Sequence, residues 1–116
     1  MKSDAERLTD IIEAADKIAI RVAQGREKFD TNEDTHIVLM HLIQIIAEAV
    51  SGLSEKLTGH HPEVPWRDIV ATRKHAVPGY FEIDLDVLWD SATIDVPRLA
   101  EDVHAIRAHQ QPITDS

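Results

Sequence analysis

The sequence predicts a single all-α domain, an antiparallel bundle of four to five helices with short loops. Apolar residues recur every three or four positions along most of the chain, which is typical of amphipathic helices. Strand signals are weak, because few β-branched or aromatic alternations occur and the sequence has no Asn-Gly or Asp-Gly hairpin turn. A length of 116 residues, with 43% hydrophobic and 28% charged residues, suits one globular domain. We assign residues 1–109 to that domain and residues 110–116 to a flexible tail.

The first helix is expected over about residues 4–24. Ser3 precedes it as an N-cap and Glu6 follows three residues later, which is the capping-box pattern. Gly25 is a natural end, and a polar connector in which Phe29 turns inward leads on from it. The apolar stripe of this helix consists of Leu8, Ile11, Ile12, Ala15, Ile18, Ala19 and Val22.

The second helix is expected over about residues 33–57, after a cap at Thr31 or Asn32 and before a terminating Gly59. Its middle, residues 37–47, is apolar on nearly every side. A helix with one wet face would not show this pattern. We therefore expect part of it to pack against a second subunit; the alternative is a central helix wrapped by the other helices of its own chain.

Two prolines in residues 60–65 predict a loop, and a short third helix is expected over residues 66–76. It ends before Pro78, because a residue that precedes proline is pushed out of the helical region.

The last helix begins near Asp84, and Pro97 is expected to kink or restart it, with Asp95 as a possible cap. Its inward-facing residues are expected to be Leu88, Trp89, Ala92, Leu99, Val103 and Ile106.

The composition excludes several classes of function. The chain has no cysteine, which removes disulfides, thiolate metal sites and a cysteine nucleophile. Its formal net charge of −9 disfavours a broad nucleic-acid surface, although it permits a small basic cleft or a partner with a basic face. No apolar run approaches the length of about 20 residues that crosses a bilayer, and the first residues are polar. We therefore expect a cytoplasmic protein that has no contact with membranes.

Seven histidines raise the question of a metal site, but no His-x-x-x-His step lies on one helix face. His60 and His61 are expected in a solvated loop, and His41 as a core or interface residue. Glycine-rich phosphate loops and a Gly-x-Ser-x-Gly motif are absent as well. We expect no metal and no cofactor.

One stretch, residues 66–81, combines charges, aromatic rings and turn formers. Arg73 offers a planar fork suited to a phosphate, and Tyr80 supplies a hydroxyl nearby in the sequence. In the alternative interpretation Trp66, Tyr80 and Phe81 are core aromatics and Arg73 pairs with an acidic side chain. The residue types alone favour that alternative.

The chain resembles the HepT-type toxins, small HEPN-domain ribonucleases of prokaryotes. The resemblance spans about residues 34–106. It is carried by Leu-Ile-Gln-Ile-Ile-Ala-Glu-Ala at 42–49, His-Pro-Glu-Val-Pro-Trp-Arg-Asp-Ile at 61–69, Arg73 to Tyr80, and Asp-Leu-Asp-Val-Leu-Trp at 84–89.

The resemblance implies a homodimer in which two sites face one cleft and cleave RNA without a metal. The family motif is Arg, four residues, His, one residue, Tyr. The ribose 2′-OH would be the nucleophile, the Arg would stabilise the phosphorane and the His would act as acid or base. In such type VII-like toxin–antitoxin pairs, a minimal nucleotidyltransferase antitoxin of the MntA type silences the toxin by AMPylation of the motif Tyr.

Residue by residue, Arg73 matches the motif Arg and Tyr80 the motif Tyr, but Pro78 stands where the family has His. Proline cannot transfer a proton. Lys74 also departs from the Asn, Asp or His common there, and His75 is a poor substitute because it lies two residues from Arg73 on a helix. Lys74 and His75 are therefore auxiliary candidates at most.

Two explanations of Pro78 stay open. This could be a natural, catalytically dead member that persists as a binding partner, or a copy that carries an inactivating change, since His to Pro needs one nucleotide. Two functional alternatives also stay open: a non-catalytic helical partner of a nucleotidyltransferase, and a dimeric scaffold without a site.

Overall fold

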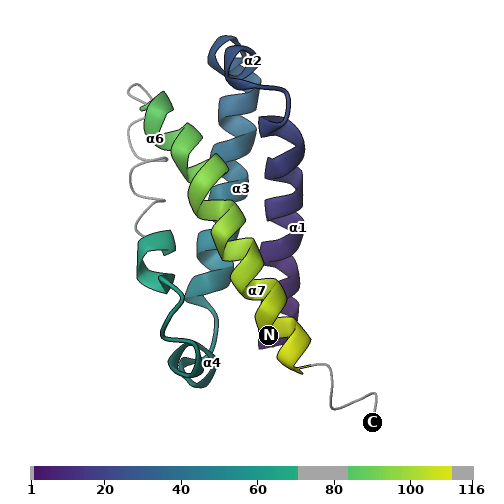
Figure 1. Cartoon of the computed structure of the whole chain (residues 1–116), viewed down its shortest axis with the longest axis vertical. Coiled ribbons are helices and arrows are strands. Elements are labelled where there is room, and N and C mark those ends of the chain that lie inside the picture. Colours follow the sequence, from purple (N-terminus) through teal and green to yellow (C-terminus); the bar gives the residue numbers. More distant parts are fainter. Residues whose placement is uncertain (1, 71–83, 111–116) are drawn as a thin grey trace.

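The computed structural model describes residues 2–70 and 84–110, with side chains up to residue 108. Across these ranges the chain is helical and contains no strand, so the predicted all-α class is confirmed (Figure 1). The pairing of two copies stays a prediction. The helices are α1 (Asp4–Val22), α2 (Arg26–Thr31), α3 (Glu33–Ser51), α4 (Glu55–His60), α6 (Leu85–Asp90), the π-helical turn η1 (Ser91–Asp95) and α7 (Val96–Gln110).

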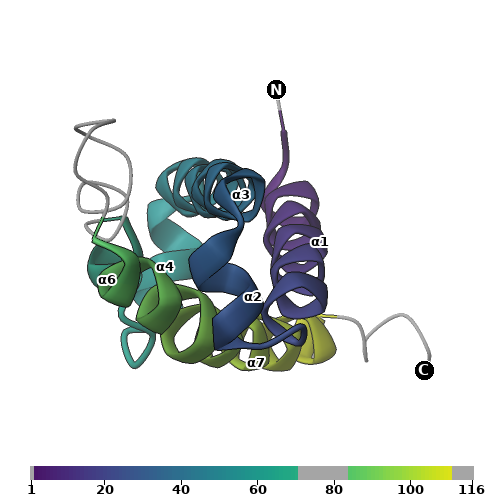
Figure 2. The same cartoon turned by 90° about the horizontal axis from the view of Figure 1, so that it is seen from above.

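Three long helices form the body of the fold. α1 packs along both α3 and α7, and the view from above shows the three around a common centre (Figure 2). Burying one large aliphatic side chain contributes roughly 1.5–3 kcal/mol, so this centre dominates the stability of the fold. Its most deeply buried side chains are Phe29, Leu8, Ile11, Ile18, Leu39, Ile46, Leu88, Leu99 and Val103.

Helix α1 follows the sequence closely. The Ser3 hydroxyl accepts a hydrogen bond from the Glu6 amide, and the Glu6 carboxylate accepts one from the Ser3 amide, both at 3.1 Å. The predicted capping box is therefore confirmed. The predicted stripe is buried from Leu8 to Ile18, but at its end Ala19 is exposed and Val22 is half-buried. Ala14, which the stripe did not include, is buried as well.

The segment that the sequence indicated as a polar connector is instead the short helix α2. Phe29 points inward, as predicted, and is 1% exposed. The turn before α2 depends on Gly25, whose φ of +99° lies in a region that side chains other than glycine rarely adopt.

The prediction that the second helix runs to residue 57 is wrong. α3 ends at Ser51, and Gly52 follows as its C-cap. Ser54 then starts α4, because its hydroxyl accepts a hydrogen bond from the Leu57 amide at 3.1 Å. Gly59 does not terminate a long helix, since it lies within α4.

Gly52 also makes room for another side chain. A Cβ atom added there would overlap the guanidinium group of Arg7, which packs across the C-terminal end of α3. The Arg7 Nε is buried and has no hydrogen-bond partner in the described part of the chain. A cation at the C-terminus of a helix interacts favourably with the helix dipole, which accounts for the position of Arg7.

Helix α3 begins as predicted, with the Asn32 side chain accepting a hydrogen bond from the Thr35 amide at 3.1 Å. It is not wrapped on all sides by its own chain, because Ile37, His41 and Glu48 are exposed. Ile37 alone is 52% exposed. The apolar middle of this helix therefore presents an outward face.

The last three elements form one continuous helical run, and Pro97 does not restart it. Val96 keeps helical angles and its amide bonds to the Ser91 carbonyl, five residues back, so Asp95 caps nothing. A π turn directly before Pro97 fits the loss of an amide donor there. The predicted inward residues are confirmed, although Trp89 is only half-buried.

A hydrogen-bonded contact joins the start of α1 to the N-cap of α4. The Asp4 carboxylate accepts from the Ser54 hydroxyl at 2.6 Å and from the Ser54 amide at 2.9 Å. The hydrogen bond from the hydroxyl contributes most and the one from the amide adds to it, and together they hold the pKa of Asp4 below its usual value.

We predict that Asp4→Asn lowers the free energy of unfolding at neutral pH. A carboxyl whose pKa is lowered by folding stabilises the fold above its unfolded pKa, and that contribution is lost as the pH falls through the folded pKa. The difference between parent and variant should therefore shrink below about pH 4. Urea unfolding over a pH series measures it, and the same substitution made in Ser54→Ala should show a weaker pH dependence. A difference that is constant with pH would contradict the assignment.

Candidate active-site segment and its anchors

The motif residues Arg73, Lys74, His75, Pro78 and Tyr80 all lie within residues 71–83, outside the described residues. Their mutual geometry stays a prediction, as does the expected end of the third helix near residue 76. The structure does establish how the chain is held on either side of this segment. Those two anchors limit where the motif can lie.

The anchor before the segment is the turn and helical stretch at residues 61–70. Val64 and Ile69 are buried, at 3% and 7% exposure. The Trp66 indole donates to the His61 carbonyl at 3.0 Å, and its ring packs half-buried against the core. The helix begins at Trp66, as predicted, because Pro65 cannot continue the preceding turn.

The anchor after the segment is α6. Asp84 caps it, since its side chain accepts hydrogen bonds from the amides of Asp86 at 3.0 Å and Val87 at 3.2 Å. Leu88, fully buried, fixes the helix to the core. Asp84 is four residues from Tyr80, so an extended chain allows at most about 14 Å between their Cα atoms.

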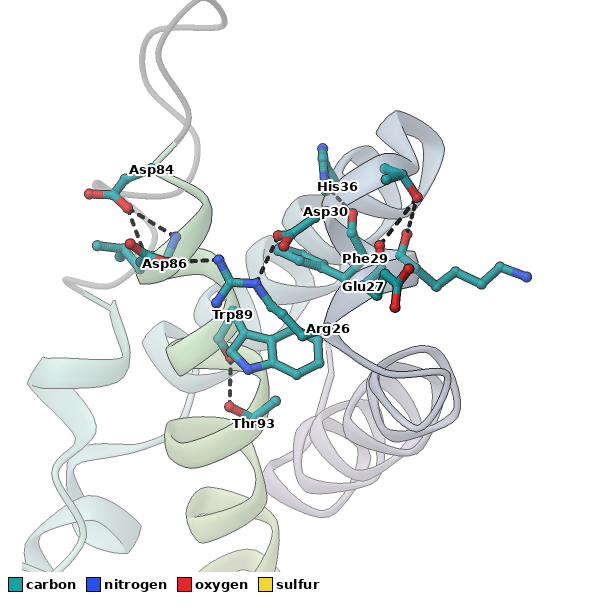
Figure 3. Close-up of polar contacts among 12 residues, drawn as sticks. Arg26, Glu27, Phe29, Asp30, His36, Asp84, Asp86, Trp89 and Thr93 are labelled. Carbon is teal, nitrogen blue, oxygen red and sulfur yellow. Dashed lines mark hydrogen bonds and ion pairs between the residues drawn. The ribbon is translucent and has the colours of Figure 1, made fainter.

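A second interaction holds α6 from the side (Figure 3). Arg26 on α2 donates from Nη2 to the Asp86 carboxylate at 2.7 Å and from Nε to the Asp30 carboxylate at 2.8 Å. Its guanidinium also lies 5.5 Å from the ring centre of Phe29 and 5.7 Å from that of Trp89. The hydrogen bond to Asp86 raises the pKa of Arg26 most, and the one to Asp30 raises it further. The guanidinium group is charged in any case.

The rings beneath Arg26 continue the contact into α3. Phe29 lies 5.0 Å from Trp89 and 4.8 Å from His36, between ring centres. His36 Nε2 lies 2.6 Å from the Phe29 carbonyl, and because a carbonyl only accepts, this nitrogen carries the proton. The three elements α2, α3 and α6 are thus joined through one aromatic cluster.

Sequence reasoning missed this cluster. The four-residue spacing of Arg26 and Asp30 was a visible signal for an ion pair along one helix. Asp86 lies 60 residues from Arg26 in the sequence, so nothing local indicated that contact. His41 is not a core residue, because it is exposed and His36 is the buried histidine among the described residues, whereas the alternative that His41 lies in an interface stays a prediction.

An acidic cleft of about 450 Å³ lies between the first anchor, at residues 61–70, and the helical run formed by η1 and α7. Burial raises the pKa of Asp95 in this cleft; Arg98 opposes the shift, and Asp90 and Asp68 add to it. Clustered carboxylates repel phosphates, so an RNA backbone would not follow this cleft. Its charged residues are Glu63, Asp68, Asp95, Arg98, Glu101 and Asp102.

In the part of the chain that the structure covers, no group of three or more His, Asp or Glu side chains could hold a metal ion. None of the helices described is long and apolar enough to cross a membrane.

Comparison with known proteins adds the decisive observation. The family model described as "Ribonuclease HepT-like" matches residues 11–106. The chain belongs to this family. The match runs from α1 to α7 and includes the whole stretch from Arg73 to Tyr80.

Relatives of this HepT-like chain carry matching names. "Probable ribonuclease HepT" of Thermococcus cleftensis is 30% identical over 99 residues, which cover 84% of this chain and 90% of that protein. "Putative RNase MJ1380" of Methanocaldococcus jannaschii is 29% identical over 100 residues, covering 85% and 92%. "Putative RNase MJ0127" of the same organism is 25% identical over 101 residues, covering 87% and 78%. No solved structure matches the chain significantly.

We predict that Arg26→Gln loosens the first turns of α6. α6 is the start of the helical run that continues through η1 and α7, and the first turn of a helix lacks partners for its own amides, so it frays first. The change removes both charged hydrogen bonds and the cation over the rings. Hydrogen exchange followed by mass spectrometry should show several-fold faster exchange of the Val87 and Leu88 amides.

The matched control is Lys28→Gln, which removes a cation from the same short helix without touching α6. Exchange should stay at the parent rate in this variant. Asp86→Asn, which weakens the same contact from the other side and leaves the bond of Arg26 to Asp30 in place, should also speed exchange of these amides. Equal exchange in parent and Arg26→Gln would show that the ion pair does not hold α6.

Proposed function

We propose that this chain is the ribonuclease toxin of a type VII-like toxin–antitoxin pair, and that this copy is catalytically silent. The observation that carries the proposal is the family match over residues 11–106. Within that range, Arg73 and Tyr80 resemble the Arg and Tyr of the family motif, and Pro78 stands where that resemblance expects His. The partner is an MntA-type minimal nucleotidyltransferase antitoxin, which neutralises the active toxin by AMPylation of its motif Tyr.

The proposed reaction is RNA cleavage without a metal. The ribose 2′-oxygen attacks the neighbouring phosphorus while its proton passes to a base. The bond from phosphorus to the 5′-oxygen then breaks, and that oxygen takes a proton from an acid. Arg73 stabilises the charge that develops on the phosphorane. Proton transfer belongs to position 78, and Pro78 can neither give nor take a proton.

Loss of that group is severe in energetic terms. General acid–base catalysis is typically worth about 100- to 10,000-fold in rate. A protonated lysine side chain such as that of Lys74 can donate but not accept a proton, and His75 lies only two residues from Arg73 in the sequence. Neither offers a simple replacement, so we expect this copy to cleave RNA slowly or not at all.

The proposal includes a homodimer through the outward face of α3. Ile37 on that face is 52% exposed, and Val38, Met40 and Ile45 beside it are only half-buried. Apolar side chains left at a surface mark an interface more often than chance. Two copies would bring two motif segments into one cleft.

A second candidate function is a non-catalytic partner that binds the nucleotidyltransferase. Pro78 and the formal charge of −9 favour it, as does the acidic cleft beside the first anchor. It differs from the main proposal in one respect that can be measured, namely whether restoring His at position 78 restores cleavage.

We predict that Pro78→His restores ribonuclease activity by at least about 100-fold, the usual worth of an acid–base group. The experiment is inducible expression of the parent and of Pro78→His without antitoxin, with growth and RNA integrity followed together. Only the Pro78→His protein should stop growth and degrade RNA. Pro78→His with Arg73→Ala is the control and should be harmless.

The other outcomes discriminate. If both proteins are silent, the binding-partner function is favoured. If both are toxic, the chemistry does not need position 78. Sequencing the source locus then separates a natural proline from a change acquired by this copy.

We predict that the nucleotidyltransferase, with ATP and magnesium, adds the mass of one AMP group to Tyr80. The tyrosine oxygen attacks the α-phosphate of ATP and pyrophosphate leaves. Mass spectrometry of the intact chain and of its peptides measures the modification, and Tyr80→Phe should remain unmodified. Tyr80 is the single tyrosine of the chain, so equal modification of Tyr80→Phe would place AMP on another residue type.

A further inference from the structure

A shallow groove lies at the seam where α7 crosses α1. Figure 2 shows α7 on the opposite side of the bundle from α3. The groove has a volume of about 360 Å³. Its floor is formed by Ala15, Ala92 and Val96, which are buried. The groove exists because both helices present small side chains at their crossing.

The rim of this groove carries apolar side chains that are exposed to solvent. Ala19 on α1 and Pro97 on α7 line it and are exposed. Ile20 follows Ala19 and is 64% exposed, while Ile94 lies three residues before Pro97 and is 46% exposed. These are two of the three large hydrophobic side chains that the described chain leaves exposed, the other being Ile37. Neither isoleucine lines the groove, but each lies one helical turn from a residue that does, Ile20 from Asp16 and Ile94 from Pro97.

The charges at the groove identify what can cover it. Asp16 and Glu101 line it from opposite sides, and both are exposed. Asp16 lies one helical turn before Ile20, and Glu101 one turn after Pro97, so each carboxylate borders an apolar side chain on its own helix. The two charged side chains that line the groove are thus both acidic.

The negative charge of the groove argues against three kinds of occupant: RNA, an anionic membrane and a second copy of this chain. RNA and an anionic membrane surface would both be repelled by the carboxylates. A second copy would meet the groove with the same groove, because a two-fold interface places identical patches opposite each other. Asp16 and Glu101 of two chains, each with a formal charge of −9, would then face one another.

We infer that the α1–α7 groove is a docking site for an amphipathic helix with basic flanks on the nucleotidyltransferase antitoxin. Apolar side chains of such a helix, three or four residues apart, would fill the groove over Ala15, Ala92 and Val96 and extend toward Ile20 and Ile94 on the neighbouring helix turns. Lysine or arginine residues beside them would pair with Asp16 and Glu101. The inference rests on the proposed function for the identity of the partner, but not for the position of the groove.

The test measures the affinity of the purified antitoxin for the chain by calorimetry, at low and at high salt. Ile20→Glu and Ile94→Glu place charges on exposed positions and should each weaken binding tenfold or more. Asp16→Lys with Glu101→Lys should weaken binding at low salt, and the loss should fall at high salt because salt screens surface charges. Circular dichroism verifies that each variant is folded.

Two control variants carry the same chemistry elsewhere. Ala108→Glu adds a charge at an exposed position near the far end of α7, and Glu55→Lys reverses an exposed charge on α4. Both should bind like the parent.

The outcomes separate the two proposals. Groove variants that bind like the parent would overturn the docking site, as would groove variants that change the sedimentation of the isolated chain, since the occupant would then be a second copy. A parent that does not bind the antitoxin at all would overturn the partner and the docking site together. Binding that depends on the groove, without AMP transfer to Tyr80, would leave the docking site standing and contradict the proposed neutralisation.

Discussion

Burial of the apolar stripe of α1 is the constraint on which the rest of the fold depends. Leu8, Ile11 and Ile18 are fully buried because α1 packs on α3 along one side and on α7 along the other. Every other element is placed relative to that packing: α2 returns the chain to α3, and α4 turns it toward the first anchor, at residues 61–70. The helices can lie this close because alanines line much of the crossing with α7.

The candidate active-site segment is suspended between two elements that are fixed independently. On one side Ile69 and Trp66 pack against the core, and on the other Asp84 and Arg26 hold α6. Two supports that are fixed independently limit the volume within which the chain between them can lie. If Arg73, Pro78 and Tyr80 act as proposed, they act between these two supports, which belong to the part of the chain that the structure describes.

How much of this could be read from the sequence follows from the range of each interaction. The capping box of Ser3 and Glu6 and the stripe of α1 were predictable, because both depend on residues three or four positions apart. The break at Gly52 was missed because the apolar pattern continues through Leu53 and Leu57. Ser54, which caps α4, lies within that pattern and was not recognised as a cap. The ion pair of Arg26 with Asp86 could not be predicted, since it exists only after α2 and α6 have been placed side by side. The motif itself was found through resemblance to a family and not through physics, since Arg73 and Tyr80 on their own also fit a structural role.

The packing of Arg7 against Gly52 links these two positions through the direction of one flexible side chain. A Cβ atom at position 52 would overlap the end of the Arg7 side chain, which would have to swing away to make room. Alanine at position 52 would therefore move the guanidinium group off the C-terminal end of α3 and weaken its interaction with the helix dipole. A glycine in this place thus keeps a cation at the end of a helix, although the two residues lie 45 positions apart in the sequence.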